Sequence, residues 1–236
     1  MCLFLKCGRA KNTFFALKDA PEDGRSSLGV GYVSVSRGGT YENYISVCVS
    51  RRKELLKQIG LSFKTMPSGT EEVITKETPE EIVEELSYQK AVDICGKLAE
   101  TLKEDFVVIG ADTVVSCWGR VMGKPKDKEE AFHMLWELQG KSHQVYTGVT
   151  LAWKYKEEPA MFYTFHECTD VTTFPMTEEE IERYIDSGEP MDKAGAYAIQ
   201  GQFAAYIQGI CGDYANVVGL PVGRVYQELK QRNLVE

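Results

Sequence analysis

The sequence predicts a single α/β domain with a mixed central sheet. From residue 45 onward, short β-prone runs alternate with stretches of helical periodicity. Residues 106–111 (FVVIGA) form an apolar run whose length is typical of a buried strand. No internal repeat and no linker divides the alternating elements. Strands and helices that alternate in one uninterrupted stretch are typical of a layered α/β fold.

The first 44 residues are expected to form a weakly ordered extension, because glycines and serines interrupt every periodic stretch. Within them, residues 30–36 (VGYVSVS) alternate as in a strand. We therefore expect the ordered domain to span residues 45–236.

The first half of this domain carries clear signals for helix ends and turns. Gly60 suits the left-handed conformation that ends a helix, and Thr78-Pro79 is typical of an N-cap and first helical position. Gly119 suits a hairpin turn. The expected elements are strand 45–49, helix 51–59, strand 61–66, helix 79–102, strand 106–111 and a hairpin over 114–122.

The second half has similar signals. Gly140 ends a helix, and Thr177 with Glu180 forms the pattern of a capping box. The expected elements are helix 128–138, strands 142–152 and 162–174, helix 178–187, short strands 196–199 and 204–210, and helix 222–232.

Composition limits the class of protein. Of 236 residues, 27 are Lys or Arg and 35 are Asp or Glu, which gives a net charge of −8. So acidic a chain repels phosphates, and we expect it to bind neither a nucleic acid polymer nor a membrane. The 7 cysteines are scattered without a C-x-x-C pair. No apolar run reaches the roughly 18 residues of a membrane span. We expect a cytoplasmic protein with reduced thiols.

Several loops have the composition of anion sites. Arg51 and Arg52 follow a β-prone run at the expected start of a helix, where guanidinium groups and free backbone N–H groups both favour phosphate. Lys124 follows a glycine, and Lys193 lies in a Gly/Ala-rich loop shortly before Gln200. For each loop alone, a surface ion pair or a simple turn is the alternative interpretation.

Asp112 directly follows the most apolar strand predicted for the chain. The mouth of a buried parallel strand is where open α/β sheets bind ligands. A carboxylate there is suited to act as a general base or as a metal ligand. A turn cap is the alternative interpretation.

Taken together, these stretches resemble the Maf, or septum-formation, family of nucleoside triphosphate pyrophosphatases. The resemblance covers about residues 45–232. It rests on RRKELL at 51–56, GADTVV at 110–115, GKP at 123–125, GKSHQVYTGV at 140–149, SGEPMDKAGAY at 187–197, QG at 200–201 and NVVGLP at 216–221. The chain is also similar to the Maf-like domain of acetylserotonin O-methyltransferase-like proteins.

The resemblance implies a single elongated domain, similar to inosine triphosphatases, with a cleft between two lobes. It implies hydrolysis of dTTP and UTP, or of modified nucleotides, to the monophosphate and pyrophosphate. Asp112 matches the catalytic aspartate, and Arg51, Thr113 and Gln200 match positions that select the substrate. The family also implies a divalent cation, Mg²⁺ or Mn²⁺, and is compatible with a homodimer.

The remaining matched positions are charged. Arg52, Lys90, Lys124 and Lys193 match basic positions around the triphosphate. Glu72 matches an acidic position that would hold the cation together with Asp112.

The chain departs from the family pattern just before the arginines. The family has Ser-x-Ser-Pro there, whereas residues 47–50 of this chain read VCVS. Since proline would rigidify that turn, its loss is expected to weaken phosphate positioning. A catalytically weak Maf-like scaffold protein is therefore the alternative function.

Overall fold

The computed structural model describes residues 29–33, 50–102, 104–155 and 158–235 of the chain. The strand expected over residues 45–49 lies outside these ranges.

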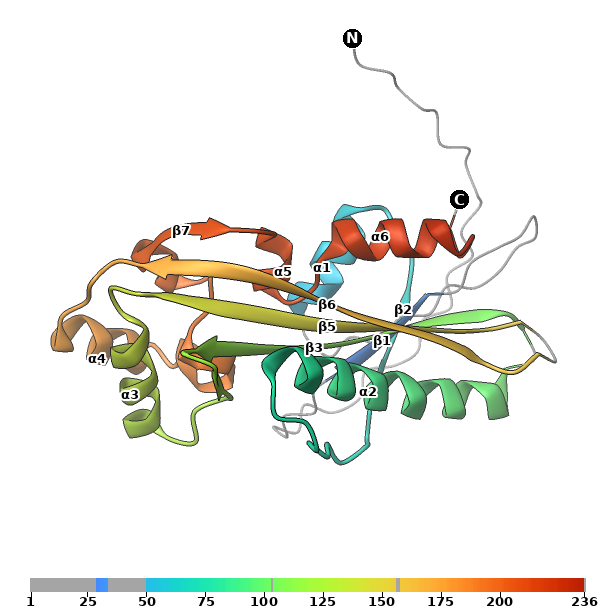
Figure 1. Ribbon diagram of the computed structural model, residues 1–236, viewed down its shortest axis with the longest axis horizontal. Coiled ribbons are helices and arrows are strands. Elements are labelled where there is room, and N and C mark those ends of the chain that lie inside the picture. Colours follow the sequence, from blue (N-terminus) through green and yellow to red (C-terminus); the bar gives the residue numbers. More distant parts are fainter. Residues whose placement is uncertain (1–28, 34–49, 103, 156–157, 236) are drawn as a thin grey trace, which may run out of the picture.

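The described strands form one seven-stranded sheet, and the molecule is elongated along it (Figure 1). The strands are β1 (Gly29–Val33), β2 (Lys64–Pro67), β3 (Phe106–Cys117), β4 (Arg120–Met122), β5 (Ser142–Lys154), β6 (Met161–Thr173) and β7 (Ile207–Cys211). Their order is β2-β1-β3-β5-β6-β7, and β4 pairs with β3. The strand expected over residues 30–36 overlaps β1, which joins β2 to β3.

Every described strand pair is antiparallel, which corrects the expectation of a mixed sheet. The reason is the place of α3 (Lys128–Leu138), which stays at the end of the sheet where β3 finishes (Figure 1). A helix that does not cross the face of the sheet returns the chain beside the strand it has just left. β5 therefore runs antiparallel to β3.

The central strand β3 is longer than the sequence predicts. We expected it to end at residue 111, but it continues through Asp112 to Cys117. The expected hairpin is confirmed, because β3 turns at Trp118 and Gly119 into β4. Asp112 is consequently a residue in the middle of a buried antiparallel strand, and not the end of a parallel one.

The five expected helices are all present. They are α1 (Ser50–Gln58), α2 (Pro79–Thr101), α3, α4 (Glu178–Asp186) and α6 (Val222–Gln231). The predicted capping box of α4 is confirmed, since the Thr177 hydroxyl accepts from the Glu180 N–H and the Glu180 carboxylate accepts from the Thr177 N–H. The short helix α5 (Tyr214–Val218) was not predicted.

The chain between α4 and β7 differs from the expected strands. Three short 3-10 helices occupy it, η1 (Glu189–Asp192), η2 (Ala194–Ala196) and η3 (Gln202–Tyr206). The strand expected over 196–199 is therefore absent, and the one expected over 204–210 begins only at residue 207. The turn of η3 lets Phe203 point inward, where it is fully buried against the rings of Tyr184 and Tyr197.

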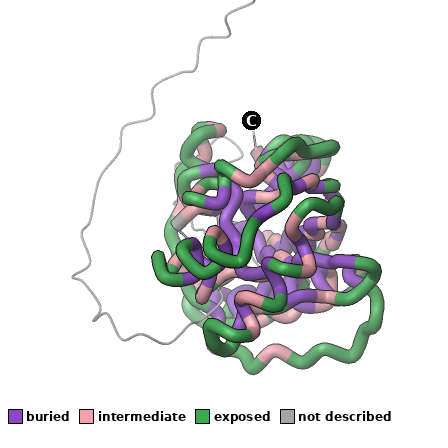
Figure 2. Tube along the Cα trace, turned by 90° about the vertical axis from the view of Figure 1, so that its left-hand side faces the viewer, coloured by how far each residue is buried: buried purple, intermediate pink, exposed green. Residues whose placement is uncertain are grey.

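Helices cover both faces of the sheet. The helix α2 runs along one face, while α1, α5 and α6 lie on the other, and α3 and α4 lie at one end (Figure 1). Buried residues run through the centre between these layers, and exposed residues lie on the outer turns (Figure 2). The sheet thus has two buried faces, and a polar side chain on either of them needs a partner.

Candidate functional site

One lysine and two carboxylates meet on the face of the sheet that α2 covers. Lys90 of α2 is 2% exposed, and its Nζ forms an ion pair with Oδ1 of Asp112. The same Nζ lies 2.9 Å from Oε1 of Glu72. Asp112 is 4% exposed, whereas the Glu72 side chain is 29% exposed. This cluster is therefore accessible from the side of Glu72.

Two glycines allow α2 to lie close enough to bring Lys90 to Asp112. At Gly110 a Cβ would overlap with the carbonyl oxygen of Ser87, and at Gly148 it would overlap with α2 backbone atoms. Asp112 is directly opposite Gly148 in the register of β3 and β5, and it lies on the same face as Gly110. Lys90 follows Ser87 by three residues, and because helical side chains point toward the helix N-terminus, its long side chain reaches back past Gly110 to Asp112.

The Arg52 guanidinium is buried beside this cluster. Its three nitrogens donate to the carbonyl oxygens of Gly219 at 2.7 Å and Ala111 at 2.8 Å, and to Thr113 Oγ1 at 2.9 Å. Burial lowers the pKa of Arg52, and the negative charge of Asp112 opposes this shift. Arg52 thus ties the start of α1 to the centre of β3.

The middle of β3 has a strand partner on only one side in the described part of the chain. On the edge away from β5, β1 pairs with residues 107–109 and β4 pairs with residues 115–117. Residues 110–114 lie between these two pairings. Arg52 donates to the Ala111 carbonyl within this interval. The predicted catalytic residue therefore lies where the edge of the sheet is interrupted.

Thr113 points to the opposite face of β3 from Asp112, because side chains alternate along a strand. Its hydroxyl lies 2.9 Å from the hydroxyl of Thr147, which donates to the Asn216 carbonyl at 3.0 Å. Asn216 in turn donates to Thr169 Oγ1 at 3.0 Å. This buried network fixes Thr113, and through it the guanidinium of Arg52.

The two predicted lysine loops lie against each other beside the carboxyl-terminal part of β3. The Gly195 N–H donates to the carbonyl of the residue before Lys124 at 3.0 Å. Gly195 has a positive φ of 66° and packs on Val115, where a Cβ would overlap with the valine side chain. Lys193 forms an ion pair with Asp192. Both lysines thus belong to one surface near the carboxyl end of β3.

Arg51 and Gln200 form no direct contact with the Asp112 cluster in the described residues. Arg51 lies in the first turn of α1. Burial raises the pKa of the Tyr184 hydroxyl, and the positive charge of Arg51 opposes this shift in part. Gln200 is exposed and precedes Gly201, which rests on the carboxylate of Glu189.

The structure therefore connects five of the predicted residues and leaves four apart from them. The connected residues are Glu72, Lys90, Asp112, Arg52 and Thr113. Arg51, Lys124, Lys193 and Gln200 lie on the surrounding loops.

Sequence reasoning missed the residues that support these positions. Thr147, Asn216 and Glu189 all lie in stretches that carried the family resemblance, and that is the signal by which they could have been found. Their partners are distant in sequence, so no local pattern predicts the contacts.

His143 of β5 is a buried histidine outside the predicted site. It is 0% exposed, and its Nε2 lies 2.8 Å from the Tyr197 hydroxyl. Burial lowers the pKa of His143 from 6.5 to about 4, and the charge of Asp170 opposes this shift only in part. His143 is therefore neutral near pH 7.

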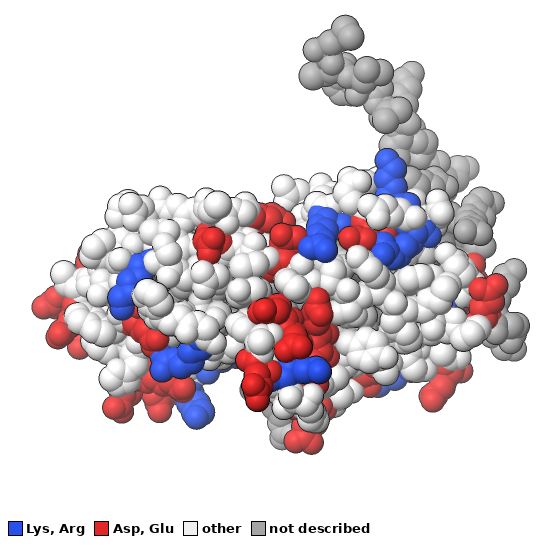
Figure 3. Space-filling view, in the orientation of Figure 1, with Lys and Arg blue, Asp and Glu red and all other residues white. Residues whose placement is uncertain are grey.

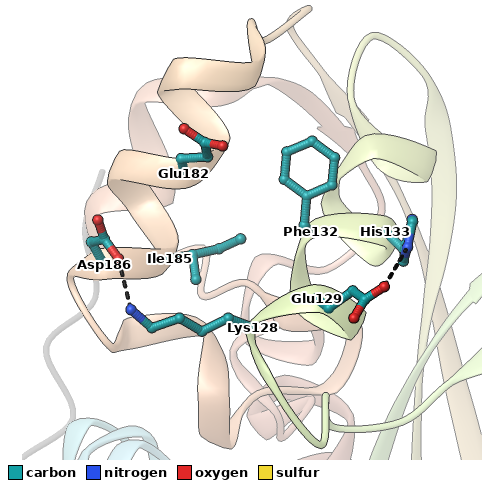
Figure 4. Close-up of a pocket in the computed structure, with 7 residues that line it drawn as sticks. All are labelled: Lys128, Glu129, Phe132, His133, Glu182, Ile185 and Asp186. Atoms are coloured by element: carbon teal, nitrogen blue, oxygen red, sulfur yellow. Dashed lines mark hydrogen bonds and ion pairs between the residues drawn. The ribbon is translucent and has the colours of Figure 1, made fainter.

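Acidic and basic groups are interspersed on the face shown in Figure 3, and no continuous basic surface covers it. A pocket of about 530 Å³ lies between α3 and α4, away from every predicted site residue (Figure 4). Its lining includes the Lys128–Asp186 ion pair, with a 2.7 Å contact, and the side chain of Phe132. None of the helices in the described residues is both long and apolar enough to span a membrane.

Most of the chain matches one known family. The model of the Maf-like protein family matches residues 49–232. The chain belongs to the Maf-like protein family. The predicted resemblance and the α/β single-domain fold are thereby confirmed. The similarity to acetylserotonin O-methyltransferase-like proteins stays a prediction.

Curated relatives extend this match. A dTTP/UTP pyrophosphatase of Agathobacter rectalis is 53% identical over 189 residues, which cover 77% of this chain and 92% of the relative. A dTTP/UTP pyrophosphatase of Lachnoclostridium phytofermentans is 48% identical, with 77% and 90% covered. One of Carboxydothermus hydrogenoformans is 46% identical, with 80% and 97% covered. The chain thus spans nearly the full length of these relatives.

Proposed function

We propose that this chain is a nucleoside triphosphate pyrophosphatase that hydrolyses dTTP and UTP to the monophosphate and pyrophosphate. The observation that carries the proposal is the contact of Lys90 with both Asp112 and Glu72. It occurs in a chain that is 46–53% identical to proteins named dTTP/UTP pyrophosphatases.

Asp112 is the proposed general base. Its Oδ1 is held by Lys90, and its Oδ2 accepts no hydrogen bond from the described residues. In the reaction, a water oxygen bonds to the α-phosphorus while the bond from that phosphorus to the bridging oxygen breaks. The water proton passes to Asp112, and the bridging oxygen leaves with pyrophosphate and its electron pair. A positioned base of this kind contributes about 10²–10⁴ in rate.

Asp112 and Glu72 are the residues that would hold Mg²⁺ or Mn²⁺. Their donor set fits such a cation, because magnesium binds through one or two carboxylates together with water and substrate phosphates. No group of three or more metal-ligating side chains gathers in the described residues, so the phosphates would supply further ligands. When bound, the cation neutralises charge on the triphosphate.

The proposed triphosphate contacts fall into two groups. Arg52 and Lys90 are buried and bonded to other protein groups. They would therefore act on the phosphates through their positive charge, and by holding Thr113 and Asp112 in place. Lys124 and Lys193 lie on adjoining loops and reach the phosphates from the rim. Positive charge at these points stabilises the leaving pyrophosphate.

Selection of the base is assigned to Arg51, Thr113 and Gln200. The Thr113 hydroxyl already contacts Arg52 and Thr147, so it acts by positioning Arg52. Gln200 is exposed, and its amide can both donate and accept hydrogen bonds to a base edge. This amide, with one donor group and one acceptor group, complements the carbonyl and N–H groups of the imide edge that uracil and thymine share.

Pyrophosphate release from a panel of nucleotides, with and without Mg²⁺ or Mn²⁺, tests this function. We expect UTP and dTTP to be the best substrates and chelation of the cation to abolish turnover. Faster hydrolysis of a modified nucleotide would shift the substrate assignment within the same reaction. Absence of release from every nucleotide would instead support the scaffold function, which the altered residues 47–50 favour.

The proposal also covers the setting of the enzyme. We assign catalysis to residues 45–236, in the cytoplasm, with a nucleotide and no nucleic acid polymer or membrane as partner. A homodimer is the proposed assembly, and light scattering after size-exclusion chromatography would test it.

A further inference from the structure

We propose that Glu189 is a positioning residue that fixes the Gln200 turn and thereby sets which base the enzyme accepts. The inference rests on the proposed function, because it presumes that Gln200 contacts the base. It assigns to Glu189 a role in selectivity without contact to the substrate.

Both carboxylate oxygens of Glu189 are bonded within the protein. Oε1 accepts from the Tyr184 hydroxyl at 2.8 Å, and Oε2 accepts from the Gln202 N–H at 2.9 Å. Gly201 lies so close that a Cβ there would overlap with the carboxylate. The carboxylate is thus held between α4 and the turn that follows Gln200.

Tyr184 completes this connection from the other side. It is 3% exposed, and its hydroxyl donates to Glu189 while accepting from the Ala198 N–H at 3.3 Å. Burial, with the adjacent negative charge of Glu189, raises the pKa of Tyr184, so the hydroxyl keeps its proton. The backbone on both sides of Gln200 is therefore bonded to the same two side chains.

The turn also packs on a cluster of buried aromatic rings. The Phe203 ring is fully buried, with its centre 5.2 Å from that of Tyr184 and 4.8 Å from that of Tyr197. The Tyr197 hydroxyl contacts His143 of β5 at 2.8 Å. The backbone of the turn is thus fixed to the sheet, while the Gln200 side chain remains exposed.

A fixed backbone that presents one exposed amide is suited to selection. A site that reads hydrogen-bonding groups discriminates well only if its own groups are held in place, since a displacement of about 1 Å can cost a factor of about 10². The positive charge of Arg51 lowers the pKa of Tyr184, against the larger effect of burial. The turn therefore lies near Arg51, which is also proposed to select the nucleobase. Loss of Glu189 would make the Gln200 turn mobile and would weaken the discrimination between nucleobases.

The test compares kcat and KM for UTP, dTTP, ATP and GTP in Glu189→Ala, Glu189→Gln and Tyr184→Phe. We expect Glu189→Ala to reduce the ratio of kcat/KM for UTP over ATP by about tenfold, mainly through KM, while kcat for UTP changes less. Glu189→Gln retains one acceptor and should restore much of the ratio. Glu182→Gln changes an exposed residue of α4, the helix that carries Tyr184, and as the matched control it should leave the ratio unchanged.

A purely structural role would lower the melting temperature of Glu189→Ala and leave the ratio unchanged, and this result would overturn the inference. If Glu189→Ala does not fold, Tyr184→Phe removes one hydroxyl and must shift the ratio in the same direction. Wild-type protein without turnover would refute the proposed function instead. An active wild type whose selectivity responds to Gln200→Ala but not to Glu189→Ala would refute this inference alone.

Discussion

Lys90 and Asp112 form an ion pair although their side chains are only 2% and 6% exposed. Removing two charges from water costs several kcal/mol each, and well-packed apolar residues are often as stabilising as the pair. A buried pair between α2 and the middle of β3 therefore indicates a role other than stability. We infer that the pair keeps a charged carboxylate in one orientation at the reaction centre.

The first prediction concerns Asp112→Asn. The amide has the size of the carboxylate and can still accept from Lys90, so the fold should persist. It cannot take a proton from water, and we expect kcat for pyrophosphate release to fall by about 10² or more. Thermal unfolding monitored beside the assay serves as the control. An unchanged kcat would refute the role as a base.

The second prediction concerns Lys90→Met. This change leaves the Asp112 carboxylate buried without its cation, and we expect the free energy of unfolding to fall by about 3–5 kcal/mol. Urea denaturation would measure this loss. Combining Lys90→Met with Asp112→Asn removes the unpaired charge and should recover part of the stability. Equal stability of the single and double variants would contradict the ion-pair argument.

The third prediction concerns the close approach of α2 to the sheet. Gly148→Ala would force backbone atoms of α2 away, and we expect a destabilisation of roughly 1–3 kcal/mol with a loss of activity through displacement of Lys90. Gly96→Ala, in the same helix, meets no atom within 4 Å and should stabilise by about 0.5–1 kcal/mol. The opposite signs of these two changes in a denaturation experiment are the expected result.

The fourth prediction is a pH dependence of stability caused by His143. In the unfolded chain this histidine gains a proton below about pH 6.5, whereas in the folded state it stays neutral down to about pH 4. The unfolded state therefore binds more protons in this window, and stability falls as the pH is lowered from 6.5 to about 4, by up to about 3 kcal/mol.

Chemical denaturation at several pH values would measure this slope. His143→Asn should lack that part of the pH dependence, whereas the corresponding change at His133, whose side chain is 72% exposed, should retain it. Identical slopes for wild type and His143→Asn would contradict the assigned pKa shift.

Helix positions were predictable because their signals are local. The capping pair Thr177 and Glu180 lies within one turn, and the proline at position 79 marks the start of α2. The extent of β3 was predicted wrongly because a charged residue was taken to end the strand. The residue that neutralises this charge, Lys90, is 22 positions away, so the contact that lets the strand continue has no local signature.

The same limit applies to the site. The family resemblance predicted Asp112 and Glu72 as cation ligands and Lys90 as a triphosphate contact, and in the structure Lys90 contacts both carboxylates. It gave no indication that Thr113 faces away from Asp112, because that follows from strand continuity through both residues. The contact of Glu189 with the Gln200 turn likewise involves the first residue of η3, a 3-10 helix whose residues 204–206 were predicted to be part of a strand.

The place of β1 in the sheet has a consequence for handling the protein. This strand comes from residues 29–33, yet it lies between β2 and β3 and supplies the only described link between them. A truncated protein that begins at residue 45 would leave residues 107–109 as an unpaired strand edge. Such an edge can pair with other copies of the chain and cause aggregation. A protein limited to the family match at residues 49–232 would therefore be prone to aggregation.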